Sequence, residues 1–196
     1  MLLPASTPMT PDEFLAWSMD REQRYELVDG VPVAMAGAKR QHDQIVVNVL
    51  GELRNQLRGQ ACRPFTADTA VRIPNQNVRL PDAGVDCGLF DREANWAATP
   101  VLVVEVLSPS TRNFDLLVKL EEYKTVTSLR HVLIVNPDLA QVFHWTRPGE
   151  DVWAYKLHET LEADIALVPP GVTLRLADVY EGVTFLATAP RLVLVQ

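Results

Sequence analysis

The stretch VVEVLSPSTRNFDLLVKLEEY, residues 103 to 123, joins a nearly continuous apolar run to a segment with helical periodicity. The apolar run, from about 100 to 107, predicts a strand that is covered on both faces of a sheet. Glu105 interrupts this run. A carboxylate in such a strand is costly to bury unless it is hydrogen-bonded, protonated, paired with a cation or bound to a metal. The stretch therefore predicts that Glu105 has a partner, unless the strand ends early and its side chain is solvated.

The flanking sequence completes an α/β pattern. Apolar residues recur at helical spacing between 41 and 57, and Asp29-Gly30 between two short extended runs is a hairpin signal. Thr10, Pro11 and the acidic pair that follows them are typical of a capped helix start. The predicted order is a helix over 10–17, a hairpin within 24–37, a helix over 41–57, strands in 62–73, 78–90 and 100–107, a helix over 113–126, a strand over 131–135 and short strands in 141–147 and 151–157.

Composition limits the classes of function. The chain has 196 residues, 47% of them apolar, which is enough for one sizeable core in one domain. A formal charge of -7 is the wrong sign for binding nucleic acid through the overall field, so a local basic patch would be needed. The candidates for such a patch are Arg72, Arg79, Arg112, Lys119 and Lys124, with scattered solvated charges as the alternative.

Two further features concern the cellular setting. No basic segment followed by a long apolar stretch opens the chain, and no run approaches 18 apolar residues, so we expect a cytoplasmic protein without a membrane span. Cys62 and Cys87 lie 25 positions apart among strand-forming residues and without CxxC spacing. This pattern favours buried free thiols over a disulfide or a zinc pair.

A second group of carboxylates lies in the strand region that precedes Glu105. Asp82, Gly84, Asp86 and Gly88 share one face by the period of two, and the glycines leave room for a ligand to approach. If this strand neighbours the Glu105 strand, Asp82 or Asp86 would stand beside Glu105, and two carboxylates with waters make a magnesium site. The alternative is an ordinary solvent-facing strand surface.

Lys119 lies at the edge of the apolar stripe of its predicted helix. An ion pair with Asp115, four residues earlier, would explain it without any function. Hydrolysis of a phosphodiester, however, requires carboxylates that hold a metal and a cation that stabilises developing charge. Asp82, Glu105 and Lys119 would supply these parts.

At these residues the chain resembles the Uma-type restriction endonuclease family, a branch of the PD-(D/E)xK nuclease superfamily. The resemblance is carried by YELVDG at 25–30, RLPDAGVDCGLF at 79–90, LVVEVLSPSTRNFDLLVKLEEY at 102–123 and HVLIVNPD at 131–138, within about residues 10 to 145. It implies a mixed sheet flanked by helices, in one restriction-endonuclease-like domain over 1–196. Its core would span 41–136, with an N-terminal helix and hairpin at 10–36 and a β-rich extension at 140–196.

The resemblance also implies roles for individual residues. Asp82 matches the PD aspartate and Glu105 the following acidic residue, and both would hold Mg²⁺ or Mn²⁺. Leu107 stands where the superfamily usually has lysine, and Lys119 would replace it from the following helix. The resemblance adds Glu26 and His42 to the catalytic pocket; the alternatives are a strand-end residue for Glu26 and an exposed helix residue for His42. Tyr123 and Asp115 also match, and we interpret them as packing and as an ion-pair or supporting residue.

The sequence leaves three functions open. The first is a metal-dependent DNA endonuclease. A homodimer that focuses basic residues into one cleft would reconcile this function with the acidic charge. The second is a nuclease fold that serves as a binding or regulatory module for nucleic acid or protein, without turnover. The third is a metal-assisted hydrolase of small phosphate esters.

Overall fold

A mixed six-stranded sheet forms the centre of the computed structural model, which describes residues 8–108, 115–149 and 152–185, with only the backbone at 115 and 116. The strand order is β10-β9-β8-β7-β6-β3, and all neighbours are antiparallel except β7 and β8. The strands are β3 (Arg63–Thr66), β6 (Ala83–Asp86), β7 (Pro100–Val106), β8 (His131–Asn136), β9 (Gln141–Thr146) and β10 (Ala154–His158). The predicted mixed α/β architecture is confirmed.

The parallel pair of β7 and β8 depends on the stretch from 103 to 123, which contains most of β7 and of the following helix. Parallel neighbours require a crossover, and α3 (Asp115–Thr125) supplies it between β7 and β8. Every residue of β7 and of β8 is buried, as the continuous apolar runs predicted. Glu105 therefore lies inside a buried strand, and the solvated alternative is wrong.

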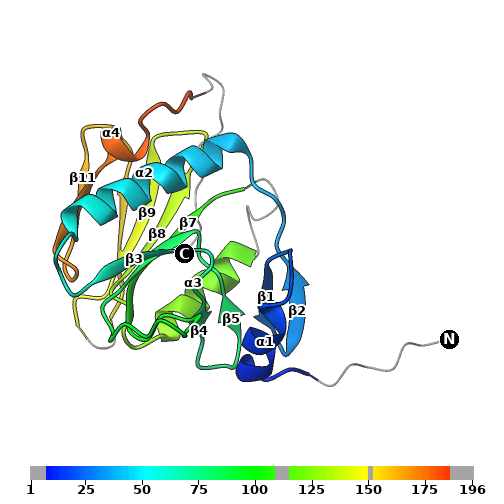
Figure 1. Cartoon of the computed structure of the whole chain (residues 1–196). Helices are drawn as coiled ribbons and strands as arrows, with labels where there is room; N and C mark the ends of the chain where they lie inside the picture. The colour runs from blue at the N-terminus through cyan, green and yellow to red at the C-terminus, as the bar shows by residue number, and fades with distance from the viewer. Residues whose placement is uncertain (1–7, 109–114, 150–151, 186–196) are drawn as a thin grey trace.

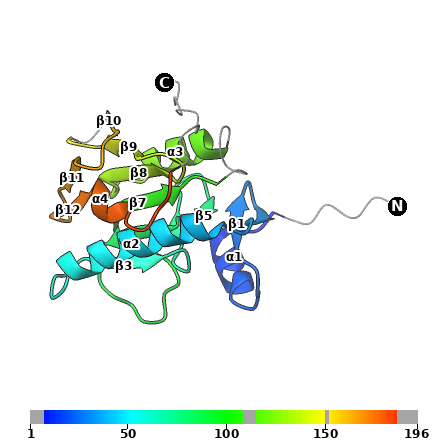
Figure 2. The same cartoon turned by 90° about the horizontal axis from the view of Figure 1, so that it is seen from above.

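Helices cover the two faces of this sheet. Figure 2 shows α2 (Arg40–Gln56) on one side of the central strands and α3 on the other. The buried side of α2 presents Ile45, Val49 and Leu53, which are part of its predicted apolar stripe. The same side of the sheet also carries the pair β11 (Asp164–Leu167) and β12 (Val172–Arg175) and the short α4 (Leu176–Val179).

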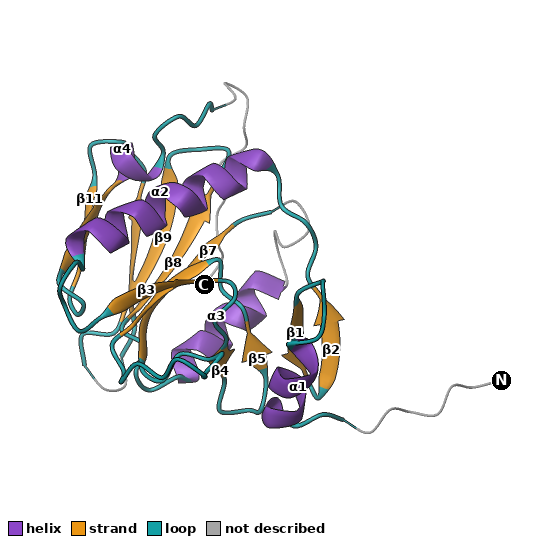
Figure 3. Cartoon of the chain, viewed as in Figure 1, coloured by secondary structure: helices purple, strands orange, loops and turns teal. Residues whose placement is uncertain are grey.

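A smaller sheet with the order β2-β1-β5-β4 lies beside the main one, together with α1 (Pro11–Ser18) (Figures 1 and 3). Its strands are β1 (Tyr25–Val28), β2 (Val31–Ala34), β4 (Val71–Arg72) and β5 (Val78–Arg79). The expected features are present: Thr10 and Glu13 form a capping box, and Asp29 and Gly30 have φ of 49° and 77° in the β1–β2 turn. No helix in the described part of the chain is long and apolar enough to cross a membrane.

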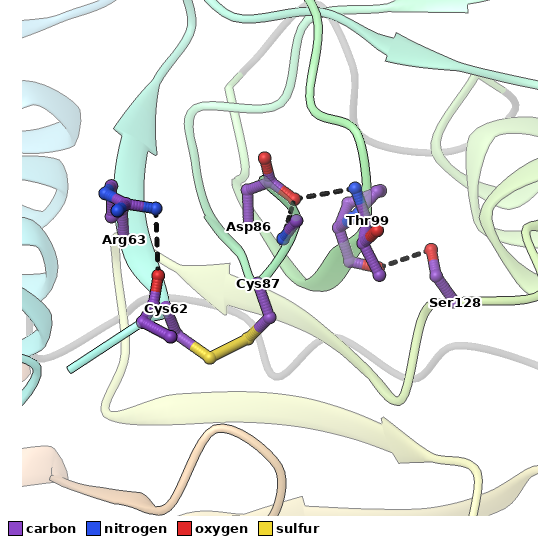
Figure 4. Close-up of a disulfide and its surroundings, with 9 residues drawn as sticks. Cys62, Arg63, Asp86, Cys87, Thr99 and Ser128 are labelled. Carbon is purple, nitrogen blue, oxygen red and sulfur yellow. Dashed lines mark hydrogen bonds between the residues drawn. A yellow bond between two sulfur atoms is a disulfide. The ribbon is translucent and has the colours of Figure 1, made fainter. Parts of the chain in front are cut away.

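The expectation of free thiols was wrong, because Cys62 and Cys87 form a disulfide (Figure 4). β3 and β6 are antiparallel neighbours, and Arg63 pairs with Asp86, so the two cysteines flank this pair on adjacent strands. Their Cα atoms are 4.0 Å apart. A separation of 25 positions contains no information about strand pairing, which is why sequence spacing did not reveal the bond.

The prediction that the glycines in and after β6 leave room for a ligand was wrong, and only one of the two aspartates lies near Glu105. Asp86 lies at the end of β6 remote from Glu105, where its carboxylate accepts hydrogen bonds from the backbone of Gly88, Ala98 and Thr99 (Figure 4). A Cβ added at Gly84 would lie 2.2 Å from Phe65 Cζ, and one at Gly88 would lie 2.7 Å from Ala98 Cβ. The space beside both glycines is therefore filled by the protein's own side chains and not by a ligand.

Candidate functional site

Asp82 and Glu105 lie at the same end of neighbouring strands. The antiparallel register of β6 and β7 pairs Ala83 with Val104, and one further step places Asp82 beside Glu105. The backbone N–H of Val106 donates to Asp82 Oδ2 at 2.7 Å, which fixes the aspartate against the end of β7. Of the two aspartates considered from the sequence, the register thus brings Asp82, and not Asp86, to Glu105.

Glu105 is buried, with 8% of its surface exposed. Two donors face its Oε1 atom: the Tyr123 hydroxyl at 2.7 Å and the Lys119 ammonium at 3.7 Å. Burial raises the pKa of Glu105 to about 7, and the negative charges of Asp82 and Glu26 act in the same direction, while Lys119 and Tyr123 oppose the shift. The Glu105 carboxyl is therefore protonated more readily than that of an exposed glutamate.

Lys119 is enclosed by acidic groups rather than exposed on the surface of α3. Its Nζ lies 2.8 Å from Glu26 Oε1, in addition to its contact with Glu105, and its side chain is 11% exposed. Burial alone would lower the pKa of Lys119, but the charges of Glu105 and Glu26 outweigh it and raise that pKa. The ammonium is therefore charged at neutral pH. The side chain of Asp115, its partner in the alternative interpretation, lies outside the described part.

Leu107 stands two positions after Glu105, where the resemblance seen in the sequence would place a lysine. It is 1% exposed and packs in the apolar cluster between the sheet and α3. The cationic group near the carboxylates is instead provided by Lys119 from α3. Lys119 thus lies close enough to the carboxylates to take the place of a lysine at position 107. The catalytic role of Lys119 stays a prediction.

Glu26 lies on β1, a strand of the β1–β2 hairpin, and its side chain is buried. Its Oε2 accepts a hydrogen bond from Arg79 Nη1 at 3.0 Å, and its Oε1 accepts from the backbone N–H of Leu80 at 3.1 Å. With Lys119 as a third donor, Glu26 is surrounded by groups that stabilise a carboxylate. It connects the small sheet to the site.

His42 lies in the first turn of α2, with its Nε2 3.2 Å from Asp82 Oδ2 and its side chain 12% exposed. Burial alone would lower its pKa, but the hydrogen bond to Asp82 and the charges of Asp82 and Glu105 raise that pKa. This pairing favours the protonated imidazole and an ion pair with Asp82. The exposed alternative for His42 is therefore wrong.

Sequence reasoning missed a buried network behind these residues. Arg79 Nε donates to Glu122 Oε2 at 2.6 Å, and Glu122 also accepts from Asn77 Nδ2 at 2.6 Å. Arg79, which the sequence suggests only as a candidate for a surface patch, is 5% exposed. A usable signal was present for Glu122, which is three residues after Lys119 and therefore on the same side of the helix.

The proposed basic patch does not form in the described part of the chain. Arg79 and Lys119 are buried against carboxylates, Arg72 lies over the ring of Trp96 and pairs with Asp12, and Lys124 pairs with Glu121. Arg112 lies outside the described residues. These four described residues thus offer no convergent surface for phosphates other than the site itself.

Four acidic side chains, Glu26, Asp82, Glu105 and Glu122, share the site with three cationic or protonatable ones, Arg79, Lys119 and His42. When Glu105 is ionised, the acidic groups outnumber the cationic ones. In the described residues, no group of three or more His, Cys, Asp or Glu side chains is arranged to hold a metal ion. Two carboxylates nevertheless fit magnesium, because this ion is commonly bound by one or two carboxylates together with waters and substrate phosphates. Asp82 and Glu105 are the residues that would hold it.

The fold is similar to a nuclease fold. A crystal structure described as that of a putative nuclease belonging to DUF820 from Anabaena variabilis ATCC 29413 matches with a TM-score of 0.71 at 19% identity. The match covers 89% of this chain and 98% of that chain. It confirms the fold.

The chain belongs to the Uma2 family: residues 11–183 match the family described as "Putative restriction endonuclease". The resemblance stated from the sequence is thereby confirmed. Two uncharacterized proteins of Synechocystis sp. are similar over most of their length. One, slr1290, is 30% identical over 90% of this chain and 94% of its own, and the other, sll1609, is 26% identical over 78% and 89%.

Proposed function

We propose that the chain is a metal-dependent endonuclease that hydrolyses phosphodiester bonds in DNA. The observation that carries this proposal is the arrangement of Asp82, Glu105 and Lys119, in which a buried cation from α3 lies 3.7 Å from a carboxylate at the end of β7. Membership of a family described as restriction endonucleases supports the same reading.

In this proposal Asp82 and Glu105 hold Mg²⁺ or Mn²⁺. The bound ion would neutralise charge on the scissile phosphate and lower the pKa of a bound water. With Glu105 ionised, the carboxylates of the site outnumber its cations. This supports the need for an ion, since a phosphate would otherwise meet net negative charge. His42, paired with Asp82 at 3.2 Å, restrains the aspartate from the side of α2.

Lys119 binds the phosphate rather than acting as a base. Its raised pKa keeps it protonated, and a protonated amine stabilises charge that develops on phosphate oxygens. Without substrate it is held by Glu26, at 2.8 Å. Glu26 has Arg79 as a second cationic partner, so it stays paired when Lys119 turns toward a phosphate.

A second candidate is a binding or regulatory module with the same fold and no turnover. It is favoured by the formal charge of -7 and by the described candidates for a basic patch, which pair with separate acidic groups instead of converging on one surface. A homodimer that brings basic residues of two copies to one cleft would remove this objection to the nuclease.

The test is cleavage of plasmid, single-stranded and structured DNA by the purified protein with Mg²⁺ or Mn²⁺. We expect cleavage that Glu105→Gln or Asp82→Asn removes, with circular dichroism showing little loss of fold. Absence of cleavage on all three substrates, with no metal binding by calorimetry, would favour the module. Cleavage of small phosphate esters but not of DNA would favour the third function.

A further inference from the structure

Tyr123 presents a polar group to the interior directly behind Glu105. Its side chain belongs to the apolar cluster between the sheet and α3, and it is 1% exposed. Its hydroxyl donates to Glu105 Oε1 at 2.7 Å. A buried tyrosine hydroxyl needs a hydrogen-bond partner, and here that partner is a carboxylate rather than a backbone carbonyl.

The two oxygens of Glu105 have different surroundings. Both side-chain donors to this residue, Tyr123 and Lys119, face Oε1. No donor to Oε2 is found in the described part of the chain. The core thus holds Oε1 and leaves Oε2 of Glu105 for a ligand. The register of β6 and β7 places Asp82 beside Glu105.

We propose that Tyr123 is a positioning residue: its hydroxyl fixes Glu105 Oε1 so that Oε2 is presented, beside Asp82, as a metal ligand. This inference rests on the proposed function. It assigns to Tyr123 more than the packing role expected from the sequence. It also explains the spacing on α3, because Lys119 and Tyr123 are one turn apart and both reach Glu105.

Tyr180 provides a matched control in the same chain. It is also buried, at 4% exposure, and belongs to the cluster on the other face of the sheet. Its hydroxyl lies 2.9 Å from the carbonyl of Gln141 and 3.0 Å from that of Asn136, so its partners are backbone groups. Tyr180→Phe therefore removes a buried hydroxyl of the same kind without touching Glu105.

The experiment compares wild type, Tyr123→Phe and Tyr180→Phe by calorimetric titration with Mn²⁺ at pH 8, with no substrate present. Removal of a group that orients a metal ligand typically costs 10- to 100-fold in affinity, so we expect Tyr123→Phe to weaken Mn²⁺ binding about tenfold. Tyr180→Phe should leave the affinity within about twofold. In a Glu105→Asp background, we expect the shorter side chain to be out of reach of the Tyr123 hydroxyl. Adding Tyr123→Phe to this background should therefore change the Mn²⁺ affinity by less than about twofold.

The readouts separate positioning from support of the fold. A variant that is partly unfolded lowers the stoichiometry of the titration, whereas a misplaced ligand raises the Kd of the folded fraction. Equal Kd values for wild type and Tyr123→Phe would overturn the inference and leave the proposed function standing. No Mn²⁺ binding by the wild type would overturn both.

Discussion

Lys119 on α3 donates a hydrogen bond to Glu26 on β1 at 2.8 Å, across 93 positions of sequence. β1 belongs to the four-stranded sheet, whereas α3 is the crossover helix of the six-stranded sheet. The contact therefore joins the two sheets at the candidate site. Formation of the site therefore requires that both sheets have folded and packed together.

Replacement of Lys119 by methionine should remove cleavage without removing the metal. We expect a decrease in the rate of about 100-fold or more, the size associated with loss of one group that stabilises the transition state. Cleavage at saturating Mn²⁺ and pH 8.5 measures this, because the high pH keeps Glu105 ionised when its cationic neighbour is lost. Lys124→Met, at a lysine on the same helix that pairs with Glu121, is the control and should retain the wild-type rate. Equal rates for both variants would exclude a role for Lys119.

Arg79 should be the most important of the described cations for stability. Removing one partner of a buried ion pair typically costs about 3–5 kcal/mol, and Arg79→Met would leave both Glu26 and Glu122 without their guanidinium partner. Arg72→Met breaks a pair with Asp12, whose side chain is 81% exposed, and should cost less than about 1 kcal/mol. Urea denaturation at pH 7 checks the contrast. Similar losses for the two variants would show that the buried network does not stabilise the fold.

Glu105 should make the metal-free protein less stable as pH rises toward neutrality. Its pKa is raised from 4.5 to about 7 in the folded state, so between these values the folded protein binds a proton that the unfolded chain has released. The free energy of unfolding therefore falls as pH increases, by on the order of 3 kcal/mol from this group. His42 acts in the same direction, because its raised pKa gives a contribution that is lost as pH rises through the folded value.

Urea denaturation of wild type and Glu105→Gln at pH 5 and pH 8 tests this titration. Relative to wild type, the variant should gain stability at pH 8. Glu121→Gln, at a carboxylate that is 70% exposed, should show no such change. Mn²⁺ should stabilise the wild type more at pH 8 than at pH 5, because the ion and the proton compete for the same carboxylate. A Glu105→Gln variant that follows the wild-type pH profile would refute the assignment.

Three buried histidines should make the protein sensitive to acid. His131, His144 and His158 lie on β8, β9 and β10; His131 Nδ1 is 3.0 Å from His144 Nε2, and the His144 and His158 rings are 5.8 Å apart. Burial lowers the pKa of all three, that of His144 to about 3. The unfolded chain therefore binds protons near pH 6.5 that the folded protein does not, and stability falls as pH falls below that value.

His144→Leu should reduce the loss of stability that occurs as pH falls below about 6.5. From pH 6.5 to 5, a folded pKa of about 3 corresponds to about 2 kcal/mol of lost stability in the wild type, which the variant should not lose. Thermal or urea unfolding between pH 5 and 7 measures the difference. His42→Gln is the contrast, since the raised pKa of His42 gives it the opposite sign. If the free energy of unfolding fell equally steeply with decreasing pH in His144→Leu and in wild type, this account would be contradicted.

The sequence was informative where structure depends on local pattern. The apolar run of β7, the periodicity of α2 and the Asp29-Gly30 turn each follow from side-chain alternation or backbone preference within a few residues. The motif around Glu105 and Lys119 also led to the right family, because it is contained in one short stretch.

Pairing between distant segments was decided by the tertiary structure alone. Asp82 and Asp86 are equivalent by alternation on one strand, and only the register with β7 places Asp82 at the site and Asp86 at the other end. The Cys62–Cys87 disulfide likewise depends on β3 lying next to β6.

The sequence by itself determined that a carboxylate interrupts an apolar strand and that a lysine follows on the next helix, and it left open whether the carboxylate is buried. The tertiary structure decided which groups surround them: Glu26 and Arg79 from the small sheet, His42 from α2, and Tyr123 from within the core. The physical reason is that alternation and helical periodicity fix the direction of a side chain relative to its own element. Register and the packing of one layer on another fix what that side chain meets.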